Sequence, residues 1–435
     1  MPIRITSESR MHLNHAAEPA RSVIRRVLWA PLLLLVLVAG CAHYEPQPLV
    51  PAALASSFEA RSFTDAGLLR YVGQHAAAGS SRANGWNLST LTLAAFYFSP
   101  DLDVARARWG SARAAEVTAG QRPNPVLQLP FGYNSSAAAG TSPYLYGLAL
   151  DIPIETAGKR GYRVARAGQL SDAAQAQIGA VAWQVRDRLR SALLDLYTAD
   201  REGAIYRQQA SLQQRVPLDA LDNLAIGFDT FDQALPGEPD AEVRRQALVN
   251  RADLRAALAT YEASQAALQL EIARQYPDIH IGPGYTFDAG QNKFSLSVSG
   301  ISLPVFNRNE GPIAEAQARR KEAAAQFTAL QAQAIVATEQ AVQAYRSAQA
   351  LLTLGEGLQT AAERALRSAG QAFDSGETDR LALLAAQSSV EASRLARTQA
   401  WVAVQRAVGQ SENALQRPLD AADAQVLRPV MESPL

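Results

Sequence analysis

Two segments of the chain alternate apolar and polar positions with the two-residue period of a β-strand, and long Ala-rich helical stretches flank both. In the second segment, residues 276–308, Phe294, Leu296 and Val298 share one face and serines occupy the other. Residues 288–292 supply the turn between the two arms. Each arm is about ten residues long, the length that crosses a bilayer as a tilted strand. The pattern therefore predicts a membrane hairpin within a helical chain.

An earlier segment, residues 125–154, predicts a second hairpin of the same kind. Its first arm alternates from Leu127 to Tyr133, and a loop of small residues follows. The returning arm places on one face Tyr144, Tyr146, Leu148, Leu150 and Ile152. The aromatic residues of the two hairpins either form girdles at the membrane interface or pack between strands: Tyr133, Tyr144, Tyr146, Tyr285 and Phe294.

The two hairpins belong to a repeated unit of helix, hairpin and long helix. The motif Arg-x-x-Pro-x-Leu-x-Leu at Arg122 matches Arg-x-x-Pro-x-Ile-x-Ile at Arg274, an offset of 274 − 122 = 152. Asp101 and Asp253, near the predicted starts of the preceding helices, keep the same offset. The chain therefore divides into a first repeat at 87–250 with strands at about 125–154, a second repeat at 251–417 with strands at about 277–306, and a tail at 418–435.

The long helix of the second repeat is predicted from about Pro312 to Phe373, with a return helix from Asp379 to about Leu415 and Thr378 as its N-cap. Small and apolar residues recur every seven positions along two neighbouring seams. The first seam combines two such series, Ala334, Ala341 and Ala348 with Ala337, Ala344 and Leu351, and the second seam contains Ile335, Val342, Tyr345 and Leu352. Two seams predict neighbouring helices on two sides, as in a cylinder of coiled helices.

The first repeat departs from this plan in its later part. Residues 216–240 are rich in Pro, Gly and Asp and lack a clear return helix. Residues 227–230 resemble the turn at 376–378, but the return arm after them is too short. Either the first helical hairpin is truncated or its tip is rebuilt.

The N-terminus carries an export signal. Arg21, Arg25 and Arg26 precede an apolar run at 27–38, which is too short to span a membrane comfortably. Cys41, the single cysteine, follows Val-Ala-Gly as in a bacterial lipoprotein cleavage box, so residues 1–40 form the predicted signal peptide and Cys41 the lipidation site. The alternatives are an ordinary signal peptide or a chance cysteine. Residues 41–86 then form the lipid tether and an N-terminal helical region.

Composition excludes several classes of function. Lys and Arg number 41, as do Asp and Glu, so charge predicts no nucleic-acid partner. No catalytic cluster is present, and we predict neither an enzyme nor a bound cofactor or metal. His280 lies in a predicted strand, where a barrel-lining or packed histidine is favoured over a metal ligand.

Four strands cannot close a barrel, and open sheet edges are not tolerated in lipid. If the hairpins enter lipid, the chain must therefore form oligomers, and three copies would supply twelve strands. The predicted fold class is mainly α with a membrane β-barrel portion, and the helices continue the barrel as a tube.

The order of these motifs resembles the TolC-like outer-membrane efflux factors. The motifs are the lipoprotein box, the helix start at Pro100, the duplicated hairpins, the Ala-Gly-Lys-Arg turn at 157–160 and the turn from Gly376 to Leu381. The Ala-Gly-Lys-Arg turn looks closest to the heavy-metal branch of the CzcC type. The resemblance implies a homotrimer with a twelve-stranded barrel in outer-membrane lipid and a periplasmic α-helical tunnel. It also implies a membrane-fusion adaptor and an inner-membrane pump of the RND type as partners.

The turn between the two long helices is the candidate contact site. By resemblance, Gly376, Thr378 and Leu381 match the motif through which relatives touch adaptors. The carboxylates of Asp374, Glu377 and Asp379 would repeat threefold around one mouth, where they either gate cations or only cap helices and face solvent. The candidate lipid-facing residues are Tyr144, Tyr146, Leu148, Leu150, Phe294, Leu296 and Val298.

The favoured function is a passive outer-membrane channel subunit of a tripartite efflux system, lipid-anchored and extending into the periplasm. Metal cations or small toxic compounds would be its cargo. The alternative is a lipid-tethered periplasmic coiled-coil protein without a pore. An exported enzyme has little support, because no catalytic residues cluster.

Overall fold

The protein is described by a computed structural model that covers residues 44–76, 85–211, 227–233, 235–238 and 240–419. The chain divides into two units, residues 1–62 and 63–435. The described part of the first unit contains one short helix, α2 (Pro51–Glu59), which begins with proline in its first turn. The predicted signal peptide, Cys41 and most of the C-terminal tail lie outside the described residues.

The second unit contains the repeated elements that the sequence predicts. Its helices are α3 (Ala66–His75), α4 (Leu88–Phe98), α5 (Pro100–Gly120), α6 (Lys159–Ser211), α7 (Asp229–Asp232), α8 (Ala241–Asn250), α9 (Ala252–Ala273), α10 (Glu310–Asp374) and α11 (Arg380–Leu415). Its strands are β1 (Val126–Gln128), β2 (Phe131–Tyr133), β3 (Tyr144–Ile154), β4 (Ile279–Asp288) and β5 (Gln291–Ser299). None of the helices in the described ranges is both long and apolar enough to cross a bilayer.

The element boundaries repeat at the offset found in the sequence. Helix α9 begins 252 − 100 = 152 residues after α5, and α10 begins 310 − 159 = 151 residues after α6. Pro100 starts α5, with the Ser99 side chain accepting a hydrogen bond from Leu102 N at 3.3 Å. The predicted order of helix, hairpin and long helix is therefore present twice.

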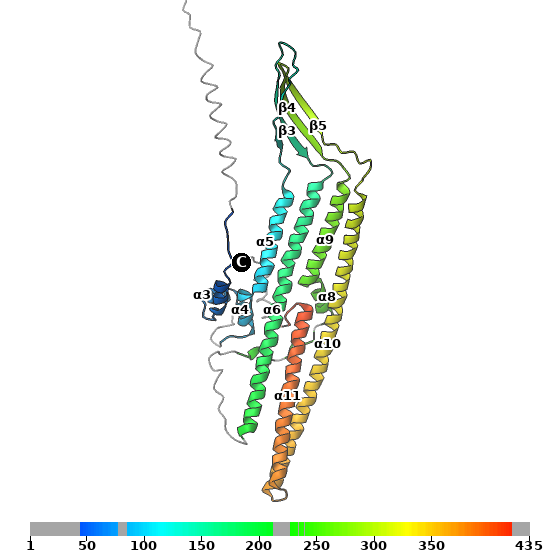
Figure 1. The fold of residues 1–435 in the computed structure, drawn as a ribbon. Coiled ribbons are helices and arrows are strands. Elements are labelled where there is room, and N and C mark those ends of the chain that lie inside the picture. The colour runs from blue at the N-terminus through cyan, green and yellow to red at the C-terminus, as the bar shows by residue number, and fades with distance from the viewer. Residues whose placement is uncertain (1–43, 77–84, 212–226, 234, 239, 420–435) are drawn as a thin grey trace, which may run out of the picture. The chain divides into compact units, whose positions relative to one another are not determined.

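The five longest helices of this unit pack side by side (Figure 1). Helix α6 packs on α5 and α9, and α10 packs on α9 and α11. The hairpins lie at one end of this bundle, and the turn between α10 and α11 lies at the other (Figure 1). Helix α10 has 65 residues, which corresponds to a length of about 98 Å.

The strands form one antiparallel sheet in the order β1-β3-β4-β5, with β2 also paired to β3. The pairs Val126–Asp151 and Tyr133–Tyr144 share one register, since 126 + 151 = 133 + 144 = 277. Strands β1 and β2 are therefore one strand position, interrupted beside Pro130, which has no N–H to donate to β3. The five strand segments thus occupy the four positions that the sequence predicts.

The second hairpin has a tighter turn than the predicted one at 288–292. Asp288 pairs with Gln291, so only Ala289 and Gly290 form the loop. Both have positive φ, 51° and 82°. Two-residue turns of this handedness match the twist of the flanking strands, which is why the strands continue farther than their alternation indicated.

The helical core is interrupted by a buried group of charges between α6 and α11. Arg186 Nη1 donates to Glu412 Oε2 at 2.8 Å, and Arg190 Nη1 donates to the carbonyl oxygen of Gln405 at 2.7 Å. All three charged side chains are at most 6% exposed. Gly409 lets the Arg190 guanidinium approach the backbone of α11, because a Cβ there would overlap it.

Both predicted seams on α10 are largely covered within the chain. Ala334, Ala341 and Ala348 of the first seam are buried, and so are Val342, Tyr345 and Leu352 of the second. Leu351, 57% exposed, and Ala337 stay accessible, so one chain leaves part of the first seam exposed.

Residues 227–230, which resemble the turn at 376–378 in sequence, do not form a helical tip like it. Phe228 and Phe231 pack against Tyr197 of α6, and Trp401 Nε1 of α11 donates to the carbonyl oxygen of Phe231 at 2.9 Å. Aromatic burial therefore holds this segment against the middle of the helices. From 227 to 250, the described residues contain only α7, of 4 residues, and α8, of 10 residues. No long return helix is present in this range, as the sequence indicated.

Replacing Gly409 with alanine tests the contact between Arg190 and α11. Alanine favours a helix by up to about 1 kcal/mol, but here its methyl group would displace a guanidinium that is held by Gln405. We expect Gly409→Ala to lower the thermal unfolding midpoint. Gly370→Ala is the matched control in α10, because no atom lies within 4 Å of the added Cβ, and it should raise the midpoint. Equal stabilisation by both substitutions would contradict this account.

Candidate functional site

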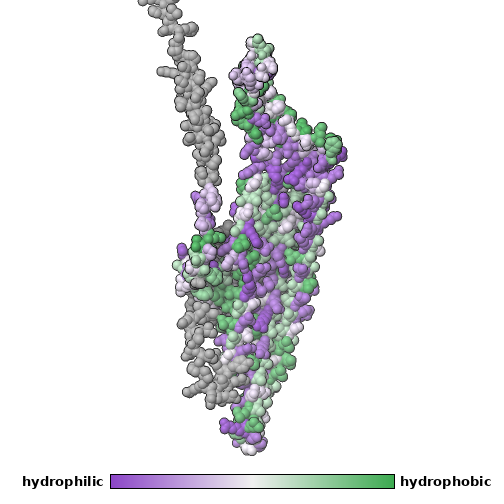
Figure 2. Space-filling view, viewed as in Figure 1, coloured by the Kyte–Doolittle hydropathy of each residue, from purple (hydrophilic) through white to green (hydrophobic). Residues whose placement is uncertain are grey.

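The sheet has one apolar face, which the register extends across all four strand positions. Residues directly opposite one another share a face, and the pairs Leu148–Tyr285 and Tyr285–Phe294 link three strands. Phe294 is 84% exposed and Leu296 is 71% exposed. Figure 2 shows hydrophobic residues gathered over the hairpins. The lipid-facing candidates of the sequence lie on this face: Tyr144, Tyr146, Leu148, Leu150, Phe294, Leu296 and Val298.

The opposite face of the sheet is small and polar. It carries Ser295 and Ser297 on β5 and glycines on β3 and β4. Gly282 is required there, because a Cβ would overlap the Ser297 hydroxyl, which donates to the carbonyl oxygen of Gly282 at 3.0 Å. The sheet therefore separates an exposed apolar surface from a surface suited to water.

The aromatic residues of the hairpins contact one another across strands. Tyr146 stacks on Phe287 with ring centroids 4.8 Å apart, and Tyr133 meets Tyr144 at 5.4 Å. The rings remain accessible, with Tyr133 64% exposed. Cross-strand packing and an interfacial girdle are compatible for these side chains, because each ring packs along one edge and leaves another open.

The turn at 157–160 joins the sheet to the helices through Lys159. The Lys159 ammonium donates to the carbonyl oxygen of Tyr276 at 2.6 Å and to Asp278 Oδ1 at 2.8 Å. Thr156 adds two bonds to the same segment, from its N–H to Asp278 Oδ1 at 2.9 Å and from its hydroxyl to the carbonyl oxygen of Pro277 at 2.6 Å. This cluster ties the end of the first hairpin to the start of the second.

Lys159 is only 7% exposed, so its charge depends on these partners. Ala157 and Gly158 have positive φ, 53° and 72°, which turns the chain so that α6 begins at Lys159. Arg160 Nε then donates to the carbonyl oxygen of Gly120 at 2.6 Å, and Arg163 pairs with Glu155. The motif that the sequence marks as a family signature is thus a structural junction.

The same contacts perturb the Asp278 carboxyl. Burial by itself would raise the pKa of Asp278, but the hydrogen bonds from Lys159 and Thr156 and the charges of Lys159 and His280 lower it below its usual range. His280 lies on the polar face and pairs with Asp151 at 3.0 Å. The described residues include no group of three His, Cys, Asp or Glu side chains placed to hold a metal ion.

The turn between α10 and α11 projects Leu381, 73% exposed, and Leu384, 49% exposed. Gly376 has φ +76°, and Glu377 N donates to the carbonyl oxygen of Ala372 at 2.8 Å, which closes the end of α10. Asp379, rather than the predicted Thr378, caps α11, accepting from Ala382 N at 2.9 Å. A carboxylate is favoured there by the helix dipole as well as by the bond.

One carboxylate of the predicted acidic group therefore has a capping role. Asp374 and Glu377 stay exposed at the turn. The structure brings together at one tip the candidates Asp374, Gly376, Glu377, Thr378, Asp379 and Leu381.

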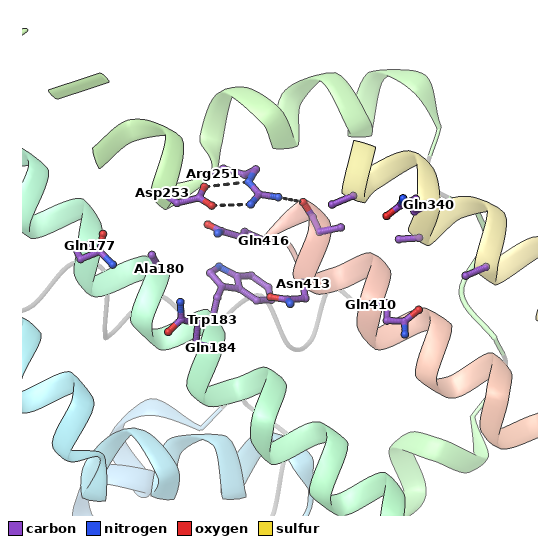
Figure 3. A pocket seen from close by; sticks show the side chains of 14 residues that line it. Gln177, Ala180, Trp183, Gln184, Arg251, Asp253, Gln340, Gln410, Asn413 and Gln416 are labelled. Atoms are coloured by element: carbon purple, nitrogen blue, oxygen red, sulfur yellow. Dashed lines mark hydrogen bonds and ion pairs between the residues drawn. The ribbon is translucent and has the colours of Figure 1, made fainter. Parts of the chain in front are cut away.

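A cavity of about 610 Å³ lies between α6, α9, α10 and α11 (Figure 3). Its walls are mainly amide side chains, including Gln177, Gln340 and Asn413. At the edge of the cavity, Arg251 and Asp253 form an ion pair with a distance of 2.7 Å, which stabilises the first turn of α9 (Figure 3). These amide groups suit water and do not form a nucleophile–base pair.

Comparison with known proteins agrees with this architecture. The sequence profile of the family described as "Outer membrane efflux protein" matches residues 243–419. The chain is 24% identical over 300 residues to the cobalt-zinc-cadmium resistance protein CzcC of Cupriavidus metallidurans, covering 57% of this chain and 71% of that protein. The second repeat, residues 251–417, thus lies within the part of the chain that resembles outer-membrane efflux proteins.

Two solved structures share the fold of this chain. A crystal structure of CusC superposes with a TM-score of 0.55 at 16% identity, covering 77% of this chain and 93% of the other. The outer membrane protein VceC of Vibrio cholerae gives a TM-score of 0.54 at 21% identity, covering 77% of this chain and 97% of the other. The predicted relationship to TolC-like efflux factors is thus confirmed.

The sequence does not reveal several residues whose contacts stabilise this fold. Lys159 was noted only as part of a motif, and its partner Asp278 lies 119 positions away. Glu412 and Arg186 are 226 positions apart. A charged residue at an otherwise apolar helical position was the available signal, but it does not name its partner.

The pKa of Asp278 predicts how stability depends on pH. Because its pKa in the folded protein is depressed, the stabilisation is present above the carboxyl's unfolded pKa of about 4 and is lost as pH falls through the lower folded value. We expect Asp278→Asn to lower the unfolding midpoint at neutral pH, with the deficit shrinking in acid. Asp288→Asn is the control, since its ion pair with Lys293 is exposed, and it should have little effect. A deficit that is constant across pH would contradict this linkage.

Proposed function

We propose that this protein is the outer-membrane channel subunit of a tripartite efflux system. The observation that carries the proposal is the sheet with one uncovered apolar face, set at the end of the long helices of an efflux-family chain. An apolar face of this kind suits lipid, and the polar face suits a water-filled lumen. The chain would act as a passive conduit that is opened by its partners.

Three copies would complete the structure as a homotrimer. Four strand positions per chain give twelve strands in three copies, enough for a closed barrel. The helices would form a periplasmic tunnel in the same symmetry. The exposed seam on α10, including Leu351 and Leu358, offers each chain a surface for its neighbour.

The adaptor would bind at the turn between α10 and α11. Among the described residues, this turn carries the exposed Leu381 and Leu384 beside the exposed carboxylates of Asp374 and Glu377. Exposed apolar side chains beside polar groups suit the docking of a partner protein.

Divalent metal cations are the proposed cargo, delivered by an adaptor and an inner-membrane pump of the RND type. The support is the similarity to a cobalt-zinc-cadmium resistance protein, at 24% identity. The described residues hold no three-ligand metal cluster, so a cation would pass as a hydrated ion. Small toxic compounds are the alternative cargo.

A lipid-tethered coiled-coil protein without a pore is the second candidate function. Lipidation at Cys41 would support either function. A heat-modifiable trimer that stays in the outer membrane after the lipid is removed supports the channel. Release of a monomer supports the tether.

A charge on the apolar face tests whether the sheet meets lipid. Arginine at a lipid-facing position near the membrane centre costs about 2–4 kcal/mol. We expect Leu296→Arg to abolish the membrane-inserted trimer, measured as a heat-modifiable band in outer-membrane fractions. Ser295→Arg, the neighbouring residue on the polar face, should assemble. Normal trimers from both variants would show that this face does not meet lipid.

Complementation tests the cargo and the tip together. A strain lacking this protein should become sensitive to divalent metals such as cobalt, zinc and cadmium while its sensitivity to drugs and dyes is unchanged. Leu381→Asp should fail to restore resistance although the trimer forms, because a charge there disrupts apolar adaptor contact. Val117→Asp, another exposed apolar position, is the control and should restore it. Sensitivity to drugs alone would reject metals as cargo.

A further inference from the structure

The two edges of the sheet are unpaired in one chain, and they differ in a way that the internal repeat explains. In the first repeat, Ile152 and Ile154 belong to β3 and pair with β4. Their counterparts in the second repeat, Leu303 and Val305, follow the end of β5 and are 75% and 69% exposed. An apolar strand sequence therefore lies outside the sheet, next to an open edge.

The observed registers allow the missing pairing to be worked out. A residue of β1 or β2 corresponds to the β4 residue 152 positions later. The two residue numbers of every β1–β3 pair add up to 126 + 151 = 277, and those of every β4–β5 pair add up to 288 + 291 = 579. Residues of β5 therefore correspond to β3 residues 579 − 277 − 152 = 150 positions earlier. After Gly300 the offset becomes 304 − 153 = 151, since Pro304 matches Pro153.

Transferring the β3–β4 pairs by these offsets gives the pairing at the open edges. The pair Leu148–Tyr285 becomes Val298 opposite Tyr133, and Ile152–Ile281 becomes Leu303 opposite Leu129. From 298 to 303 there are five steps, but from 133 to 129 there are four. One extra residue must therefore be accommodated between them, at Gly300–Ile301.

We propose that residues 301–305 become a strand in the assembled protein by pairing with residues 127–131 of a second copy of this chain. Leu303 lies opposite Leu129, Val298 lies opposite Tyr133, and Gly300 and Ile301 form a β-bulge opposite Phe131. The inference rests on the proposed trimeric barrel and specifies the seam that closes it between copies.

The backbone hydrogen-bonding groups of both edges fit this register. Gly147 N donates to the carbonyl oxygen of Pro130 at 2.9 Å, so even-numbered residues of the first arm face β3. Leu129 and its odd-numbered neighbours 127, 131 and 133 therefore turn their N–H and C=O outward. The pair Asp288–Gln291 at the tight turn likewise makes Val298 and the other even residues of β5 face outward. The proposed pairs thus bring outward-facing groups together.

Gly300 has the conformation that the bulge needs. Its φ is +75°, and glycine in the left-handed region is the first residue of one class of β-bulge. A Cβ at Gly300 would also overlap the His280 ring, which pairs with Asp151. The extra residue moves Ile301, Leu303 and Val305 onto the apolar face with Phe294, Leu296 and Val298. Both sides of the seam then present apolar side chains in the same direction.

Cysteine cross-linking in the full-length, membrane-assembled protein tests the seam. Cys41 is the only natural cysteine, so any disulfide that the unmodified chain does not form must come from the introduced cysteines. Leu303→Cys combined with Leu129→Cys, and Val298→Cys combined with Tyr133→Cys, should form intermolecular disulfides under mild oxidation. Directly opposite residues are about 5.5 Å apart between Cα atoms, within disulfide range. The readout is the dimer and trimer ladder on non-reducing gels.

Offset pairs are the matched controls, because they share the same faces and one of the same cysteines. Leu303→Cys with Leu127→Cys or with Phe131→Cys should cross-link several-fold less than the direct pair. A stronger band at either offset would overturn the register. Cross-linking of Leu303→Cys to Gln128→Cys would overturn the bulge. Leu303 would lie opposite Gln128 if the register of the pair Val298–Tyr133 continued without an extra residue. Trimers without any of these cross-links would reject the seam alone, whereas the absence of trimers for the unmodified chain would reject the barrel itself.

Discussion

Backbone N–H and C=O groups at an open sheet edge have no partner in lipid, and each unpaired group costs several kcal/mol there. A four-position sheet has two such edges, and no arrangement of one chain removes them. This constraint connects the features of the hairpins. The outward-facing groups on both edges, the glycine at position 300 and the exposed apolar residues after it all become consistent when a second copy supplies the partner strand.

The junction between sheet and helices depends on a small number of polar contacts. Lys159 joins two chain segments, the turn at the end of the first hairpin and residues 276–278 at the start of the second. Farther along the helices, Glu412 joins Arg186 and Arg190 in a buried group between α6 and α11. Removing one member of such a group leaves a charge buried, which is costly. These contacts fix how the helices stand relative to the strands, whereas small residues such as Ala341 set how closely the helices pack.

The two halves of the chain share one plan but differ at the end away from the sheet. The second half has a complete helical hairpin, α10 and α11. In the first half, α6 is followed within the described residues by the short helices α7 and α8, and Phe231 of α7 packs into the middle of the bundle. Within the described ranges, exposed leucines and carboxylates gather at the turn between α10 and α11.

Much of this architecture could be predicted from the sequence because its signals are local. Each of these signals reflects contacts made by one element: the strand alternation at 294–298, the proline that starts α5 and the seven-residue spacing along α10. The offset of 152 residues located the two repeats. Other features depended on tertiary contacts. Asp379 rather than Thr378 caps α11, and Phe228 and Phe231 bury where a turn was expected. Lys159 and Asp278, like Arg186 and Glu412, are joined only when the chain folds, since no periodicity within one segment identifies a charge partner more than a hundred residues away.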